Sequence, residues 1–195
     1  MSFPGAVLAA LAFASMTAVV PIAARELAGF RLPESVEVEP EGVALSLIGA
    51  HVRTYLFRDV SLFALYAAER PASFDALIAS SAPKRVAVTI LRPTFTAERF
   101  RTGWREQFDA VLSEAERTRY SKEIAEFIDT FETLNRGETI TFDFAPGKGV
   151  RFSIRGEPKR VINNDEFAAA LLGVWMGPRS VDRELRRKLL GVDTN

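Results

Sequence analysis

Two short segments with strictly alternating apolar residues place the strongest constraint on the fold. Residues 140–144 have Ile or Phe at every second position, and residues 150–154 repeat the pattern with Val, Phe and Ile. The intervening residues, Pro146 to Gly149, favour a tight turn. Side chains on a strand alternate between its two faces, so one face of this hairpin is apolar and the other faces water. The pattern predicts an antiparallel sheet with one covered face.

Further strand-like segments come earlier in the chain. They are rich in Val, Leu, Ile and aromatic residues and comprise residues 43–48, 52–57, 60–68 and 84–92. Gly49 and Ala50 predict a bend or a bulge between the first two of these segments. Arg58 and Asp59 separate the second from the third. The acidic segment before them, residues 33–42, predicts a solvated entry segment or an edge strand.

Helical periodicity appears in two regions, one on each side of the hairpin. Thr96 can cap a helix whose apolar residues recur from Phe100 to Val111 at helical spacing. Three more helices are predicted over residues 120–134, 165–176 and 181–190, the last capped by Ser180. Strands, helices, strands and helices in this order indicate an α+β fold, in which helices pack on the apolar face of an antiparallel sheet.

The first 24 residues contain none of the charged residues of the chain. An apolar segment from Ala6 to Val20, then Pro21 and a small residue at position 24, is typical of a secretory signal. The segment lacks the basic residue that usually begins such a signal. We expect residues 1–24 to be a signal peptide and residues 25–195 to be one exported, periplasmic or extracellular domain. An uncleaved membrane anchor and a buried helix are the alternatives, and membrane contact is expected only if the leader is retained.

The composition excludes several kinds of site. Lys and Arg total 25, Asp and Glu total 25, and the formal net charge is zero, which argues against a general electrostatic attraction to nucleic acid. The chain has no Cys and one His, so Cys-ligated zinc, iron–sulfur clusters and multi-histidine metal sites are excluded. We therefore predict no metal, no cofactor and no nucleic-acid partner.

Arg53 is the residue that stands out among the strand-like segments. Arg53, Tyr55 and Phe57 share one face of their strand. An Arg in apolar surroundings either points to water or is buried with an anion that compensates its charge. A buried guanidinium suits a carboxylate, which it can hold with two parallel hydrogen bonds. Both alternatives are compatible with the pattern.

Three other features carry weaker hypotheses. His51 is either structural or part of a site, but it has no evident partner that would make its protonation matter. Lys148 lies in a Gly-rich turn, yet a strand follows it rather than a helix, so a hairpin turn is predicted and not a phosphate-binding loop. The last helix ends in basic residues, which favours a solvated face, with an anionic partner as the alternative.

Several motifs resemble the chalcone isomerase fold. The segment Gly49-Ala50-His51-Val52-Arg53 and the following residues 60–66 are similar to two of its strands. Residues 166–177, 180–182 and 185–191 are similar to the closing helices of bacterial exported chalcone isomerase-like proteins. The resemblance implies an open-faced β-sandwich, with a large antiparallel sheet, helices over one side and a ligand cleft between them.

The resemblance also implies roles for single residues. The Arg that steadies an oxyanion in plant isomerases, or a carboxylate in fatty-acid-binding relatives, corresponds to Arg53. The catalytic Thr falls near Ser61, which would point away from Arg53 if residues 58–59 form a two-residue turn. No Tyr occupies residues 94–100, where the catalytic Tyr belongs, and a substrate-contacting Thr corresponds to Val174. Chalcone isomerase activity is therefore not expected, and no catalytic residue is assigned.

Three functional hypotheses follow from the residues and the resemblance. The first is a non-catalytic protein that binds a fatty acid or a similar amphipathic carboxylate, with Arg53 and Ser61 as ligand-binding residues. The second is an isomerase or lyase that acts on an unknown substrate, with Arg53 at an oxyanion and His51 as base. The third is a structural or partner-binding protein whose cleft is filled by side chains. The first is the function that we predict.

Overall fold

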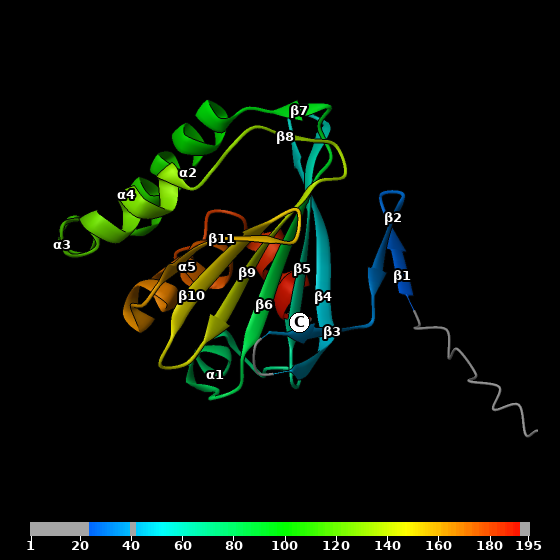
Figure 1. Cartoon of the computed structure of the whole chain (residues 1–195), viewed down its shortest axis with the longest axis horizontal. Helices are drawn as coiled ribbons and strands as arrows, with labels where there is room; N and C mark the ends of the chain where they lie inside the picture. The colour runs from blue at the N-terminus through cyan, green and yellow to red at the C-terminus, as the bar shows by residue number, and fades with distance from the viewer. Residues whose placement is uncertain (1–23, 40–41, 192–195) are drawn as a thin grey trace, which may run out of the picture.

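Seven strands form a curled antiparallel sheet that helices cover on one face (Figure 1). The structure is a computed structural model that describes residues 24–39 and 42–191. The strands of this sheet are β3 (Ser35–Val38), β4 (Val43–Tyr55), β5 (Arg58–Ala67), β6 (Lys84–Ile90), β9 (Thr139–Ala145), β10 (Gly149–Ile154) and β11 (Glu157–Ile162). Their order is β11-β10-β9-β6-β5-β4-β3. The predicted hairpin is β9–β10, and the predicted α+β class is confirmed.

Helices and two small ribbons complete the described part of the chain. The helices are α1 (Phe74–Ala79), α2 (Ala97–Val111), α3 (Glu114–Arg119), α4 (Ser121–Asp129), α5 (Asp165–Met176) and α6 (Arg183–Leu190). The ribbons pair β1 (Ala24–Leu27) with β2 (Phe30–Pro33), and β7 (Thr94–Phe95) with β8 (Leu134–Asn135). Helix α5 packs on β10 and helix α6 packs on β4, while α2 and α4 lie side by side (Figure 1).

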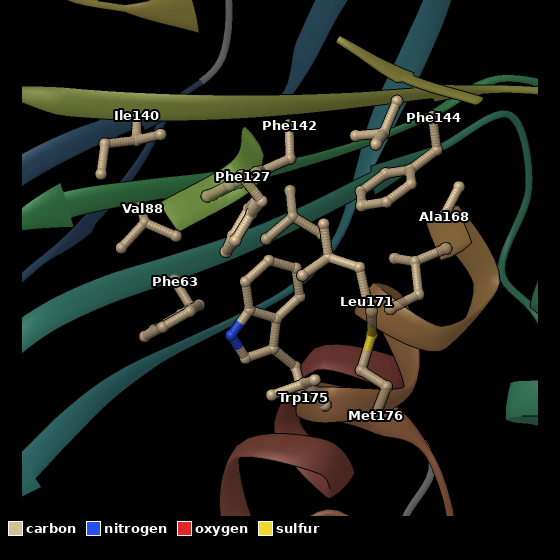
Figure 2. Packing of buried hydrophobic residues seen from close by; sticks show 14 of the residues in the cluster. Phe63, Val88, Phe127, Ile140, Phe142, Phe144, Ala168, Leu171, Trp175 and Met176 are labelled. Atoms are coloured by element: carbon tan, nitrogen blue, oxygen red, sulfur yellow. The ribbon is translucent and has the colours of Figure 1, made fainter. Parts of the chain in front are cut away.

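The main hydrophobic core lies between the sheet and the helices. Alternate residues of the central strands point into it, among them Phe63 of β5, Val88 of β6 and Phe142 of β9 (Figure 2). The ring of Trp175 in α5 lies 5.1 Å from that of Phe142 and 5.4 Å from that of Trp104 in α2, edge to face in both pairs. Aromatic pairs favour this geometry. Aromatic contacts thus join α2 and α5 to the sheet.

The opposite face of the sheet is covered over part of its area. Leu62 and Tyr66 of β5 are buried there, in a second cluster that includes Leu32 of β2. On the same face, Arg85 of β6 donates two hydrogen bonds to Asp143 of β9, at 2.5 and 2.8 Å. Asp143 is buried, so the prediction that this side of the β9–β10 hairpin faces water is wrong at that residue. Its charge can be buried because a paired guanidinium compensates it.

Strand β4 unites the two segments that were predicted on either side of Gly49. Its register against β5 shifts between Leu47 and Gly49, so the predicted bulge is confirmed. Strand β3 comes from the acidic segment and lies at the edge of the sheet. This agrees with one of the two alternatives predicted for that segment.

The helix starts follow the predicted caps more closely than the helix ends do. Thr96 caps α2 with its side chain as predicted, and Asn164 caps α5. The helix predicted over residues 120–134 is shorter, because the chain leaves α4 and Leu134 pairs with β7. Helix α6 is capped by Asp182 rather than by Ser180. The capping box that starts α3 was not predicted.

The predicted signal peptide lies outside the described residues except for Ala24, which begins β1. The signal peptide therefore stays a prediction, as do its two alternatives, a membrane anchor and a buried helix. Within residues 24–39 and 42–191, none of the helices has the length and apolar character needed to cross a bilayer.

Candidate ligand-binding site

The β4–β5 hairpin brings Arg53 and Ser61 together. Its turn lies at residues 56–57, and residues 58–59, which were predicted to separate the two strands, belong to β5. Both turn residues have positive φ angles, 47° and 59°, which is the pattern of a two-residue turn between right-twisted strands. In this register Arg53 lies directly opposite Ser61. Residues that are directly opposed share a face of the sheet, so the condition under which Ser61 would point away from Arg53 is not met.

A cavity of about 160 Å³ lies between the sheet and α2, and Arg53 and Ser61 both line it. Aromatic and aliphatic side chains form most of the remaining wall, including Phe63, Ile90, Phe100, Trp104, Phe142 and Trp175. A largely apolar cavity with few polar groups is the usual design of a small-molecule site, because the polar groups fix the orientation of the ligand.

The guanidinium of Arg53 has a distant counter-charge. Its Nε lies 3.8 Å from a carboxylate oxygen of Asp182, and the two side chains are 33% and 28% exposed. This separation is too long for a hydrogen bond. The other oxygen of Asp182 accepts a hydrogen bond from the backbone N–H of Leu185 at the start of α6. Within the described residues no hydrogen bond occupies the guanidinium, so its N–H groups are available to a carboxylate.

Further polar groups line the same cavity. Ser61 is buried, and among the residues that the structure describes its hydroxyl has no hydrogen-bond partner. Helix α2 contributes Arg99, Glu106 and Gln107 to the wall. Sequence reasoning missed these α2 residues and Asp182. The helical spacing of Phe100 and Trp104 marked the apolar face of α2 but did not indicate that this face borders a cavity.

The structure places the other candidate residues outside the cavity wall or in a different role. His51 of β4 lies opposite Phe63 of β5. Phe63 lines the cavity, but His51 does not. Val174 is buried elsewhere in the core. In the segment where the isomerases carry their catalytic Tyr, Phe95 lines the cavity instead. The arrangement therefore offers the Arg53 cation and the Ser61 hydroxyl in a largely apolar cavity, with the carboxylates of Glu106 in the wall and Asp182 beside Arg53.

The Gly-rich turn between β9 and β10 is closed by a carboxylate of the chain itself. The backbone N–H groups of Gly147 and Gly149 donate hydrogen bonds to Asp165, at 2.7 and 2.8 Å. The predicted hairpin turn is confirmed. Its N–H groups donate to the carboxylate of Asp165. In the part of the chain that is described, no group of three or more His, Asp or Glu residues is placed to hold a metal ion.

Comparison with known proteins agrees with this architecture. The profile of a family described as chalcone isomerase-like matches residues 24–191. The fold is similar to that of a fatty-acid binding protein from Arabidopsis thaliana, with a TM-score of 0.63 and 18% sequence identity, over 80% of this chain and 96% of that chain. A comparison with curated proteins gives no match. Because the family match extends from the start of β1 through the end of α6, the chain belongs to the chalcone isomerase-like family.

Proposed function

We propose that this protein is exported and binds an amphipathic carboxylate without transforming it. Arg53 would hold the carboxylate, Ser61 would donate a further hydrogen bond, and the aromatic cavity would take the apolar part of the ligand. The observation that carries the proposal is a guanidinium without a hydrogen-bonded partner, within the described residues, at the wall of an apolar cavity. The similarity in fold to a fatty-acid binding protein supports the same class of ligand.

The two other hypotheses have less support. An isomerase or lyase that used His51 as its base would need that imidazole beside the ligand, and His51 does not line the cavity. A purely structural protein with a filled cleft would have no cavity beside Arg53, whereas a cavity of about 160 Å³ lies there.

Native mass spectrometry of the protein recovered from the cell tests both parts of the proposal. The mass reports whether the leader is removed, and we expect the mass of residues 25–195. Added dodecanoate should bind, and the uncharged dodecanol should bind more weakly because it cannot use the charge of Arg53. Charge-assisted hydrogen bonds contribute about 1.5–3 kcal/mol. Arg53→Ala should therefore weaken dodecanoate binding by about tenfold or more and should affect dodecanol little.

Arg160→Ala is the matched control. It removes an Arg from β11 that does not line the cavity, so dodecanoate binding should be unchanged. Equal affinity of the original protein and Arg53→Ala for dodecanoate, or no binding by either, contradicts the proposed function. A measured mass that includes residues 1–24 contradicts the proposal that the leader is removed on export. The binding measurements test the carboxylate proposal independently of that mass.

A further inference from the structure

The β4–β5 hairpin ends in three exposed apolar side chains, which we call the apolar tip. Tyr55 is 68% exposed, Leu56 is 73% exposed and Phe57 is fully exposed. The other exposed large hydrophobic residues of the described chain are Val161 and Val181. These are smaller and lie apart from one another, as isolated surface residues usually do. The apolar tip is thus the place where exposed aromatic and aliphatic side chains are contiguous.

The backbone conformation at the apolar tip is one that large apolar residues rarely adopt. Leu56 and Phe57 both have positive φ angles, a conformation that Asn and Gly adopt readily and that Leu and Phe rarely adopt. A turn selected for hairpin stability would carry Asn-Gly or a similar pair. Strained positions of this kind persist where another requirement outweighs their cost. At the apolar tip the strained positions carry large apolar side chains that the fold leaves in water, which the stability of the turn does not explain.

We propose that the apolar tip inserts into the interfacial region of a lipid bilayer. Tyr, Phe and Leu are side chains that favour this region, where an apolar body meets water and headgroups. Arg58 follows the tip, is exposed, and makes no ion pair with any described residue. It can keep its charge among the headgroups while the tip is immersed.

The shape of the tip argues against a protein partner. It is a convex two-residue turn with an aromatic side chain in the turn, Phe57, and a second beside it, Tyr55, and each of these can bury roughly 150–250 Å². A stable protein–protein interface buries about 800 Å² on each partner and needs a complementary surface. A bilayer needs no complementary shape. A small projecting apolar tip therefore suits a lipid surface better than a second copy of this chain.

The tip belongs to the same hairpin as the ligand-binding site. Arg53 precedes it on β4 and Ser61 follows it on β5, and both line the cavity. Figure 1 shows this end of the hairpin at the end of the molecule where β7 and β8 also lie. Insertion of the tip would bring the Arg53 side of the cavity close to the bilayer surface, where amphipathic carboxylates accumulate. The membrane contact itself does not depend on the proposed ligand.

Sedimentation with vesicles of phosphatidylcholine and phosphatidylglycerol tests the proposal. All variants are prepared in the same processed form as the original protein. The double variant Leu56→Asn/Phe57→Gly replaces the tip with residues that favour the turn, so it should unfold at a higher urea concentration and bind vesicles at least about tenfold more weakly. Val161→Ser is the matched control and should bind like the original protein. If the double variant binds vesicles as well as the original protein, or if neither binds, the proposal fails.

Tryptophan fluorescence locates the contact independently of the leader. In Phe57→Trp the new indole should shift its emission to shorter wavelength with vesicles and be quenched by brominated lipids, while the new indole of Val161→Trp should do neither. An emission shift of Phe57→Trp that depends on protein concentration and needs no vesicles would indicate self-association and overturn the proposal. Arg53→Ala should retain vesicle binding, so failure of the carboxylate proposal and failure of the membrane proposal can be told apart.

Discussion

At the scale of single residues, Gly49 determines how closely α6 can approach β4. A Cβ atom at this position would lie 2.1 Å from the carbonyl oxygen of Lys188 and 2.6 Å from that of Leu189. Both are backbone atoms, so the helix itself would have to move. The N-cap of α6 is Asp182, the counter-charge of Arg53. The absence of a side chain at Gly49 therefore helps to place the carboxylate of Asp182 beside Arg53 in the candidate site.

Gly49→Ala should destabilise the protein by about 1–3 kcal/mol or more, because the added methyl overpacks a helix–strand contact. Gly103→Ala is the matched control. Gly103 lies in the middle of α2, and a Cβ there would meet nothing within 4 Å, so alanine should raise the free energy of unfolding by up to about 1 kcal/mol. Urea unfolding of both variants measures the difference. Equal effects of the two substitutions would contradict the close approach of α6.

The residues of the site differ in how far the sequence could predict them. Arg53 stood out because a cation in a strand-like apolar segment needs an explanation. Ser61 came from the family resemblance, and its orientation toward Arg53 depended on the position of the turn, which the sequence left open. Asp182 was not predicted, since its position beside Arg53 depends on how α6 packs on β4. Contacts between distant segments are set by tertiary packing, which local patterns do not record.

At the scale of elements, local patterns predicted strand faces and helix starts better than they predicted turns and helix ends. Alternation placed β9 and β10 correctly because burial of one face requires it. The turn at residues 56–57 was missed because large apolar residues rarely occupy positive φ angles, so the polar pair at 58–59 was predicted to separate the two strands. The apolar Leu134 suggested a longer helix, but pairing of β8 with β7 removes it from the helix.

Glu116 joins two elements that are distant in sequence. It forms the capping box of α3 with Ser113 and accepts two hydrogen bonds from Arg179, which lies between α5 and α6. The hydrogen bonds from Arg179 contribute most, and those from Ser113 contribute further, to a lowering of the pKa of Glu116 to about 2. The ordinary pKa is 4.5. The folded state thus binds this proton less readily than the unfolded state does.

The stability that this carboxylate contributes should depend on pH. It should be complete above about pH 4.5 and be lost as the pH falls toward 2. For a half-exposed ion pair we expect up to about 1 kcal/mol. The difference in unfolding free energy between the original protein and Glu116→Gln should therefore be largest near about pH 7 and shrink near about pH 3. Glu114→Gln, in the same helical turn, is the control; a difference for Glu116→Gln that does not change with pH would rule out this role.

At the scale of the whole molecule, the cavity is small for the class of ligand that we propose. Its volume is about 160 Å³, close to that of a cavity of about 150 Å³ that holds benzene. Typical ligand sites measure about 300–1,000 Å³. The cavity can take the part of an aliphatic chain next to the carboxylate. For the rest of a longer chain to be buried as well, α2 must separate from the sheet, across the aromatic contacts of Trp104.

The affinity for saturated carboxylates should therefore depend on chain length in two stages. From hexanoate upward each added methylene should strengthen binding by roughly fourfold while the cavity fills. Beyond that point the gain per methylene should fall, because each further methylene is buried only if α2 moves away from the sheet. Calorimetry with carboxylates from hexanoate to hexadecanoate measures the gain in affinity per methylene. With the long chains, the backbone amides of α2 should become less protected from hydrogen exchange, while those of α5 should not. If the gain in affinity per methylene is constant and the hydrogen-exchange protection of α2 is unchanged, long chains bind without separating α2 from the sheet, and the prediction is wrong.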